Sequence, residues 1–471
     1  MKIIDKIYVN GEFITPHGTE IFDLINPTTN ELIGQVTLGD EEDTRKAIAS
    51  AKAAFPAFSI TTVEERIGYL QRLYDAVVKR SDELTAVMTL EYGAPQQFAG
   101  LITDYAAKSF SNAIETLKTF EFVRKVGSST VILEPLGVAG IITPWNASYT
   151  FICGKLATAI SAGCTAVIKP SEMSAMQTQI ITECLHEAGL PAGVFNIVNG
   201  LGEVVGAEIT SHPDIAKISF TGSTVVGKMI ARGAVDTMKR VTLELGGKSP
   251  NILLDDADFN QAIPQAIIAA FGNTGQACIA GTRLLVPENR LEEVKALVKA
   301  IVPQFKVGDP AEAATALGPL VSKKQYDRVQ QYIKLGVEEG AELLVGGEGH
   351  PEGLEAGNFV KPTVFTGVTN DMRIAREEIF GPVLSIITYQ TEEEAIAIAN
   401  DTSYGLQAYV SSADVERAKR VASKINAGRV VINGLNHDPF APFGGFKQSG
   451  IGREYGVYGL EAYLEPKAII I

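Results

Sequence analysis

Cysteine is scarce in this chain of 471 residues, and tryptophan occurs once. No two cysteines form a C-x-x-C pair, and no histidine stands at metal-ligand spacing from any of them. A disulfide framework is therefore excluded, and we expect no metal site. Free cysteine is usually a small buried hydrophobe, so Cys153, Cys164 and Cys184 are expected in the core. Cys278 stands in a different context.

Positive charge is also in short supply. The formal net charge is -14, and no run of Lys and Arg exceeds two residues. Proteins that bind nucleic acid neutralise backbone phosphates with a basic face. Because this chain has no basic segment, we exclude nucleic acid as a partner.

Long apolar runs are missing as well. No uncharged apolar stretch reaches the roughly 18 residues of a membrane span. The N-terminus begins Met1-Lys2-Ile3-Ile4-Asp5, and its early charges interrupt any secretory hydrophobic region. We therefore expect a cytoplasmic protein without a membrane partner.

The residues that are present predict an α/β protein. A hydrophobic fraction of 46% can supply a large core, and the length favours about two or three domains. An Asn-Gly pair predicts a hairpin turn at residues 10–11. Helical periodicity is found over 41–55, 62–90 and 97–118.

From residue 130 onward, short β-prone runs alternate with helical ones, which indicates βαβ units and parallel sheets. The first group of predicted strands is 137–143, 165–169, 194–198, 215–220 and 241–245. A second alternating region spans 251–435, with strands at 282–287, 341–346, 382–389, 407–411 and 428–433. Its helices are predicted at 258–272, 288–303, 322–340, 392–400 and 413–426. An apolar strand at the extreme C-terminus would be a liability if exposed, so we expect it to pair.

Two strand ends could bind the phosphates and sugar of a nucleotide. The segment FTGSTVVG at 220–227 follows a predicted strand and opens a helix, where free N–H groups favour an anion. Lys169 and Glu172 follow another strand and could contact a ribose. Both segments also fit simple capped turns. The glycines at 200–206 have the spacing G-x-G-x-x-x-G, which departs from the dinucleotide fingerprint.

Three separate positions have side chains suited to acyl chemistry through a thioester. Cys278 follows a Gly-Gln turn and is a candidate nucleophile. Glu244 closes an apolar strand, where burial would raise its pKa toward that of a general base. The amide of Asn146 could donate to an oxyanion. Spacing alone does not show that these residues meet.

A series of motifs in order along the chain resembles the aldehyde dehydrogenase superfamily. They are EPLGV at 134–138, TPWN at 143–146, KPSE at 169–172, FTGST at 220–224, LELGGKSP at 243–250, GQAC at 275–278, EEIFGP at 377–382 and PFGGFKQSG at 442–450. The resemblance covers nearly the whole chain. One departure is Ala147-Ser148-Tyr149 after Asn146, where the family often has an apolar residue and then proline. That segment lines the family's substrate tunnel.

The resemblance implies roles residue by residue. Cys278 corresponds to the nucleophile, Glu244 to the base that activates water, and Asn146 to the oxyanion donor. The implied cofactor-binding residues are Trp145, Lys169, Glu172, Gly202, Gly222, Ser223, Gly227, Leu245, Glu378 and Phe380. Glu172 favours NAD, because it would repel the 2′-phosphate of NADP; Lys169 leaves NADP possible.

The implied fold has three parts: a Rossmann-like cofactor domain, an α/β catalytic domain and a small β arm for oligomerisation. The predicted ranges are 1–116 with 136–246, 247–450, and 117–135 with 451–471. Relatives with this layout are homodimers or homotetramers.

The implied reaction is oxidation of an aldehyde to a carboxylic acid, with hydride transfer to NAD(P) and hydrolysis of a Cys278 thioester. Tyr149, Phe151, Phe440 and Phe443 favour an apolar or aromatic aldehyde. A semialdehyde carboxylate would require an arginine, and segments 146–153 and 435–443 contain none. Two alternatives are acyl transfer of a CoA-acylating or esterase-like type and a non-catalytic binding protein. Glu244 argues against the CoA-acylating type, and the intact set of Cys278, Glu244 and Asn146 argues against a non-catalytic protein.

Overall fold

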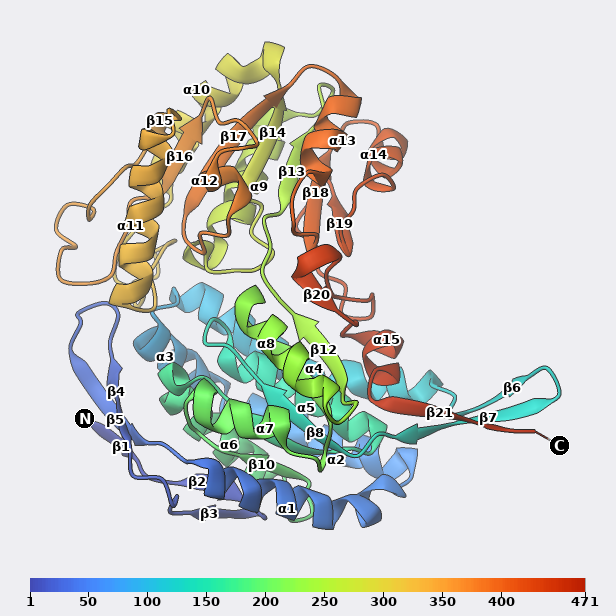
Figure 1. Cartoon of the computed structure of the whole chain (residues 1–471). Helices are drawn as coiled ribbons and strands as arrows, with labels where there is room; N and C mark the ends of the chain where they lie inside the picture. Colours follow the sequence, from blue (N-terminus) through green and yellow to red (C-terminus); the bar gives the residue numbers. More distant parts are fainter. Residues whose placement is uncertain (471) are drawn as a thin grey trace.

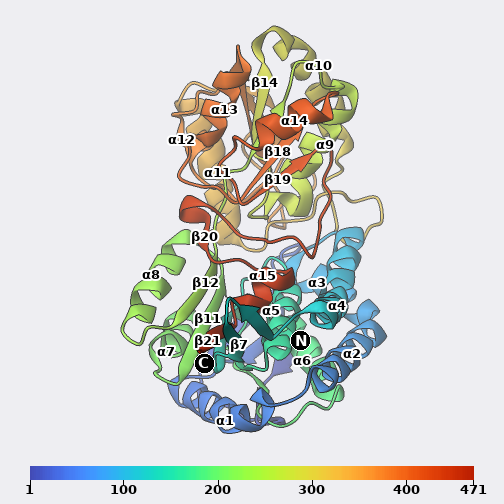
Figure 2. The ribbon, with the colours of Figure 1, turned by 90° about the vertical axis from the view of Figure 1, so that its right-hand side faces the viewer.

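A computed structural model describes residues 1–470 of the chain. Two α/β units lie one above the other, each built around its own mainly parallel sheet (Figure 1). The lower unit contains the N-terminal half of the chain, and the upper one is built from residues that follow Glu244 (Figure 2). The predicted α/β class is confirmed.

An eight-stranded sheet organises the lower unit. Its central strands are parallel and are, in spatial order, β12 (Arg240–Glu244), β11 (Ile215–Thr221), β8 (Val138–Ile142), β9 (Thr165–Lys169) and β10 (Phe195–Ile197). Antiparallel strands extend its edges: β20 (Gly450–Ile451) beside β12, and the predicted hairpin β2 (Ile7–Val9) and β3 (Glu12–Ile14) beside β10. A small separate sheet contains β1 (Lys2–Ile4), β5 (Leu32–Thr37) and β4 (Ile21–Ile25).

Helices cover both faces of this sheet because its strands are apolar on both sides. On β8, Ala139 and Ile141 pack into one core, whereas Val138 and Ile142 pack into another, as the alternation of strand side chains requires. The first core includes α2 (Val63–Lys79), α3 (Ser81–Tyr92), α4 (Gln96–Thr119), α5 (Ser148–Ala162) and α6 (Ala175–Glu187). The second includes α1 (Glu41–Ser59), α7 (Ala207–Ser211) and α8 (Thr224–Val235).

The upper unit has a seven-stranded sheet. Its strands are, in spatial order, β15 (Glu342–Val345), β16 (Thr363–Thr366), β17 (Val383–Tyr389), β14 (Arg283–Pro287), β13 (Pro250–Leu253), β18 (Gln407–Ser411) and β19 (Arg429–Ile432). Only β15 is antiparallel to its neighbour. The main helices are α9 (Phe259–Phe271), α10 (Leu291–Ile301), α11 (Lys323–Glu338), α13 (Glu392–Asn400) and α14 (Val415–Ala422), and the short α12 (Arg373–Arg376) precedes β17.

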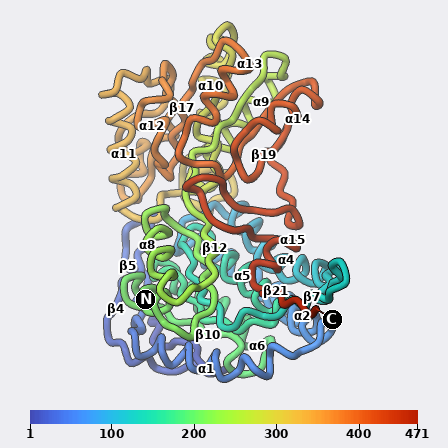
Figure 3. Tube along the Cα trace, turned by 45° about the vertical axis from the view of Figure 1, so that its right-hand side comes forward, coloured from blue at the N-terminus to red at the C-terminus, as the bar shows by residue number. Residues whose placement is uncertain are grey.

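A fourth sheet projects from the body as an arm (Figure 1). It consists of β6 (Val123–Val126), β7 (Ser129–Pro135) and β21 (Leu464–Ile469). Before it reaches the arm, the C-terminal segment runs from β19 back to the lower unit, where β20 and α15 (Gly456–Glu461) pack (Figure 3). The C-terminal strand pairs with β7 over six residues, so the expectation that it pairs is confirmed.

Some predicted elements differ from the observed ones. The single helix predicted over 62–90 is two helices that meet at Arg80, whose ψ of 22° breaks the helical backbone. The helix predicted over 413–426 ends at Ala422. Strands β13 and β16 were not predicted, because each has only four residues and both are buried throughout, so neither shows alternation.

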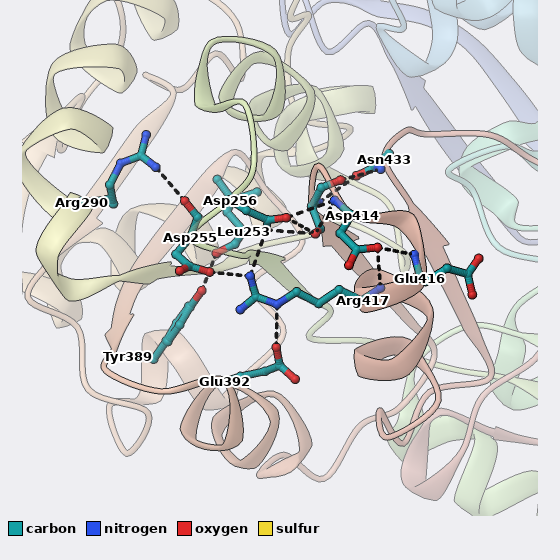
Figure 4. Close-up of polar contacts among 11 residues, drawn as sticks. Leu253, Asp255, Asp256, Arg290, Tyr389, Glu392, Asp414, Glu416, Arg417 and Asn433 are labelled. Carbon is teal, nitrogen blue, oxygen red and sulfur yellow. Dashed lines mark hydrogen bonds and ion pairs between the residues drawn. The ribbon is translucent and has the colours of Figure 1, made fainter.

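A polar cluster ties the upper unit together at one end of its sheet (Figure 4). The guanidinium of Arg417, on α14, donates to Glu392 at 2.9 Å, to Asp255 at 2.6 Å and to Asp256 at 3.2 Å. Asp256 also accepts a hydrogen bond from the hydroxyl of Ser412. Helices α13 and α14 are thereby joined to the chain that leaves β13.

Candidate active site

Cys278 follows a strained turn at the end of α9. Asn273 and Thr274 have φ angles of 56° and 53°, which is the left-handed region that residues other than glycine rarely adopt. Hydrogen bonds hold this turn in place: the Tyr92 hydroxyl donates to Asn273 Oδ1 at 2.9 Å, and the Val321 N–H donates to Gln276 Oε1 at 3.0 Å. Backbone strain of this kind persists where the surroundings over-determine it, and it often marks a functional site.

Asn146 reaches the same turn from the lower unit. It follows the carboxyl end of β8 and is 7% exposed. Its amide Nδ2 donates to the carbonyl oxygen of Gln276 at 3.0 Å, and Asn273 Nδ2 donates to the carbonyl oxygen of Asn146 at 3.3 Å. Two hydrogen bonds therefore hold Asn146, the predicted oxyanion donor, against the turn that precedes Cys278.

Glu244 ends β12 and is 2% exposed. Neither of its carboxylate oxygens has a hydrogen-bond partner within residues 1–470. Burial raises its pKa well above the usual range, and the charge of Glu454 raises it further, whereas Lys155 acts in the opposite direction. Lys155 and Glu454 form a buried ion pair that also contacts Ser219. A buried, unpartnered carboxylate with a raised pKa is poised to accept a proton.

Glu244 and Cys278 belong to one site. Burial raises the pKa of the Cys278 thiol to about 12, and the negative charges of Glu378 and Glu244 act in the same direction. The backbone N–H groups of Cys278 and Ile279 partly offset this increase. A Cβ built on Gly247 would lie 2.2 Å from the carbonyl oxygen of Cys278, so the chain that leaves Glu244 packs directly against the cysteine.

The start of α8 forms a cradle that fits a phosphate. Ser223 is the N-cap of α8, and its hydroxyl accepts from the Val226 N–H at 3.3 Å. A Cβ on Gly227 would lie 2.4 Å from Leu245 Cδ2, so helix and strand pack closely there. The Gly222 N–H donates to the carbonyl oxygen of Glu244 at 3.0 Å, which ties this cradle to the base. Free N–H groups at the helix end suit an anion.

Lys169 and Glu172 meet at the carboxyl end of β9, with Lys169 Nζ 3.0 Å from Glu172 Oε2. Gly202 begins a short π-helical segment, Gly202–Gly206, and a Cβ on Gly202 would touch nothing within 4 Å. At the other end of that segment, a Cβ built on Gly206 would lie 4.0 Å from the side chain of Lys169. These residues surround one edge of the sheet, as ligand sites in open α/β sheets do.

Glu378, Phe380 and Trp145 lie on the side of the site that faces Gly247. Glu378 Oε1 accepts from the Gly247 N–H at 2.9 Å, and burial raises the pKa of this carboxyl to about 7. Phe380 has a φ of 65°, and its ring stands edge-on to that of Trp145 at 5.4 Å. A planar ring system could pack against such a pair. The donors, carboxylates and open cradle together fit a dinucleotide.

An aromatic cluster lies beside the nucleophile and the base; its members are Tyr105, His437, Phe443 and Tyr455. Of the aromatics singled out from the sequence, Phe443 belongs to it, whereas Tyr149 is fully buried and its hydroxyl contacts Thr103, so Tyr149 is a core residue. Burial raises the pKa of Tyr455, and the charges of Glu454 and Glu244 add to this effect.

Sequence reasoning missed several residues at this site. They are Lys155, Arg429, Glu454 and Tyr455. Glu454 and Tyr455 could have been found from the sequence, because they lie in the segment that directly follows the PFGGFKQSG motif. Lys155 and Arg429 have no local signal of this kind.

Within residues 1–470, no group of three or more His, Cys, Asp or Glu side chains is arranged to hold a metal ion. In the same range, no helix combines the length and the apolar character that a membrane crossing requires.

The chain is similar to known proteins in both sequence and fold. The sequence profile described as "Aldehyde dehydrogenase family" matches residues 13–469. A 3-succinoylsemialdehyde-pyridine dehydrogenase from a Pseudomonas species is 44% identical, over 100% of this chain and 99% of that protein. Aldehyde dehydrogenase C from Pseudomonas syringae, solved as a mutant with NAD+ and octanal, is 47% identical with a TM-score of 0.97, over 99% of this chain and 96% of that one. An NAD+ complex of a Mycobacterium tuberculosis aldehyde dehydrogenase is 39% identical with a TM-score of 0.97, over 100% and 98%.

Proposed function

Because the chain belongs to the aldehyde dehydrogenase family, we propose that it oxidises an aldehyde to a carboxylic acid through a thioester on Cys278. One observation carries this proposal. Glu244 is a buried carboxylate without a hydrogen-bond partner in residues 1–470, and its charge acts on Cys278. The amide of Asn146 donates to the carbonyl oxygen of Gln276, two residues before Cys278 in the chain. Nucleophile, base and oxyanion donor are the parts that acyl chemistry through sulfur requires.

In the proposed mechanism, the thiol of Cys278 releases its proton to solvent, and its sulfur then adds to the aldehyde carbon. The oxyanion of the resulting thiohemiacetal receives hydrogen bonds from Asn146 Nδ2 and from the Cys278 N–H. The hydride of the thiohemiacetal carbon then leaves toward the nicotinamide that NAD, when bound, would supply, and a thioester on Cys278 remains. Glu244 then takes a proton from water, whose oxygen adds to the thioester carbon. The carboxylic acid leaves as the carbon–sulfur bond breaks, and the proton held by Glu244 passes to the released thiolate, which restores Cys278.

The cofactor is NAD, as it is in the solved relatives. We assign its adenosine ribose to Lys169 and Glu172, its pyrophosphate to the α8 cradle of Gly222 and Ser223, and its nicotinamide end to Glu378 and Phe380. Trp145, Gly202, Gly227 and Leu245 complete this cofactor side. The predicted domain ranges assign 1–116 with 136–246 to cofactor binding and 247–450 to catalysis.

Selectivity for NAD over NADP depends on Glu172 in this proposal. The substitution Glu172→Gln removes a negative charge that would repel a 2′-phosphate and keeps the shape of the side chain. We expect the ratio of kcat/KM for NADP to that for NAD to rise about 10- to 100-fold. The exposed Glu187 on α6 offers a matched control, since Glu187→Gln removes the same charge away from the ribose. An unchanged ratio in Glu172→Gln would show that another group selects the cofactor.

The chain also has surfaces suited to a homodimer or homotetramer. On α8, Val225 is 71% exposed and Met229 is 62% exposed. On the arm, Val123 and Val126 on the edge strand β6 are 58% and 59% exposed. Free strand edges and apolar helix faces favour association. Sedimentation velocity should give an oligomer for the wild type and a smaller species for Met229→Asp; a wild-type monomer would refute the proposal.

An apolar or aromatic portion of the substrate would pack against Phe443 and Tyr455. The test is NADH formation by the purified protein with octanal, benzaldehyde and shorter aldehydes. Turnover with any of them supports the reaction class. If no aldehyde yields NADH although NAD quenches the fluorescence of Trp145, the protein binds the cofactor without this activity. If NADH formation requires added coenzyme A, the acceptor is a thiol rather than water.

A further inference from the structure

Arg429 lies against the aromatic cluster, although no motif points to it. It is the first residue of β19 and pairs in register with Gln407 of β18. Its guanidinium carbon lies 5.4 Å from the centre of the Phe443 ring, and its Nη1 donates to His437 Nδ1 at 2.9 Å. Strand β19 therefore places the positive charge of Arg429 against Phe443. The residue after Phe443, Gly444, lies against the carboxylate of Glu244.

This charge has no partner in the protein. Among residues 1–470, no carboxylate oxygen lies within 4 Å of the Arg429 guanidinium, and its Nε is buried without a hydrogen-bond acceptor. Several other arginines of the upper unit differ: Arg376, Arg373 and Arg417 each pair with acidic side chains. An unpaired guanidinium beside a reaction centre would gain from an anionic ligand.

His437 adds a second donor at the same place. Partial burial and the charge of Arg429 lower its pKa to about 4, against a smaller opposing effect of Asp438, so its ring is neutral at pH 7. Because Nδ1 accepts from Arg429, the ring proton is on Nε2. The rings of Tyr105 and Tyr455 flank the imidazole at centroid distances of 5.8 and 5.5 Å. The Arg429 guanidinium and His437 Nε2–H are thus two N–H donors at the aromatic cluster, and the cluster contains no carboxylate that could accept from them.

Tyr455 connects this pair of donors to the reacting atoms. The groups with an electrostatic effect on its hydroxyl are Glu454, Glu244, Arg429 and Cys278. Arg429 and Cys278 are therefore both near one aromatic residue. Phe443 has a similar position, because its backbone pairs with that of Glu454 and the next residue, Gly444, lies against Glu244.

We propose that Arg429 is a specificity-determining residue that binds a carboxylate at the far end of the aldehyde substrate, with His437 as a second donor. The substrate class is then an ω-carboxy aldehyde, or semialdehyde, whose apolar chain lies along Phe443 and Tyr455. This inference rests on the proposed aldehyde oxidation. It also supplies the arginine that the segments 146–153 and 435–443 lack.

The test compares semialdehydes with plain aldehydes of the same chain length: succinate semialdehyde with butanal, and glutarate semialdehyde with pentanal. In wild-type enzyme, kcat/KM should favour the carboxylated member of each pair. Arg429→Met should lower that ratio about 10- to 100-fold, mainly through KM, because a charge-assisted hydrogen bond is lost. Arg429→Lys should retain part of the preference, and added salt should raise KM for the semialdehydes alone.

Arg420 provides the matched control, because it is an exposed arginine on α14 without an ion pair in the described residues. Arg420→Met should leave the ratio and the rates at wild-type values. The proposal is overturned if wild-type enzyme oxidises butanal and pentanal without preferring the semialdehydes, or if Arg429→Met keeps the wild-type ratio. It is also overturned if a neutral keto aldehyde is preferred as strongly as the carboxylate. Failure to oxidise any aldehyde would instead refute the proposed function.

Discussion

Replacing Cys278 by alanine is expected to lower kcat for aldehyde oxidation by about 10⁴-fold or more, since no thioester can form without the sulfur. Neither Glu244 nor Asn146 replaces the sulfur, because their proposed roles are base and oxyanion donor. The variant should still bind NAD, because Trp145, Glu378 and the α8 cradle do not depend on the cysteine side chain. The measurement is the rate of NADH formation under saturating NAD and aldehyde.

The single tryptophan makes this test selective. Trp145 packs edge-on against Phe380, so cofactor binding should change its fluorescence in both wild type and Cys278→Ala. Cys184, buried in α6, provides the matched control: Cys184→Ala removes a thiol from the core and should keep full activity. Substantial turnover by Cys278→Ala, with normal cofactor binding, would mean that hydride leaves a species other than a Cys278 adduct.

Replacing Glu244 by glutamine is expected to separate the two halves of the reaction. The first turnover should still form NADH, in an amount that matches the enzyme, because Cys278 and Asn146 are intact. Steady-state turnover should then fall about 10²- to 10³-fold, since no base activates water for thioester hydrolysis. Rapid mixing that records the NADH burst, followed by the steady rate, measures both. Equal loss of burst and steady rate would place Glu244 in the first half instead.

The pH dependence follows from the same carboxylate. Burial raises the pKa of Glu244 well above its usual range, so the group is protonated and inactive as a base at lower pH. The steady rate should therefore rise with pH through this raised pKa and level off above it. Glu244→Gln should lose that limb of the profile, whereas the exposed substitution Glu416→Gln should retain it. A limb that persists in Glu244→Gln would assign the titration to another group, such as the Cys278 thiol.

Local patterns in the sequence were sufficient for most elements of the fold. The strands β9, β17 and β18 and the helices α9 and α13 lie within one or two residues of their predicted ranges. Each is long enough to show its own periodicity or is bounded by turn residues. The helix break at Arg80 escaped prediction, because the apolar spacing continues across it. The strands β13 and β16 escaped it because each has only four residues, all of them buried, so neither shows an alternating pattern.

Motifs in the sequence also identified the family and named Cys278, Glu244 and Asn146, since each stands in a distinctive local context. Only the tertiary structure brought these residues into one region, placed Tyr149 in the core and carried Arg429 to the aromatic cluster. The physical reason is that a motif records constraints among neighbours in the chain. The environment of a side chain depends on elements from distant parts of it: the turn after α9, the ends of β8 and β12, and the first residue of β19. Burial, missing hydrogen-bond partners and unpaired charge arise only when those elements pack together.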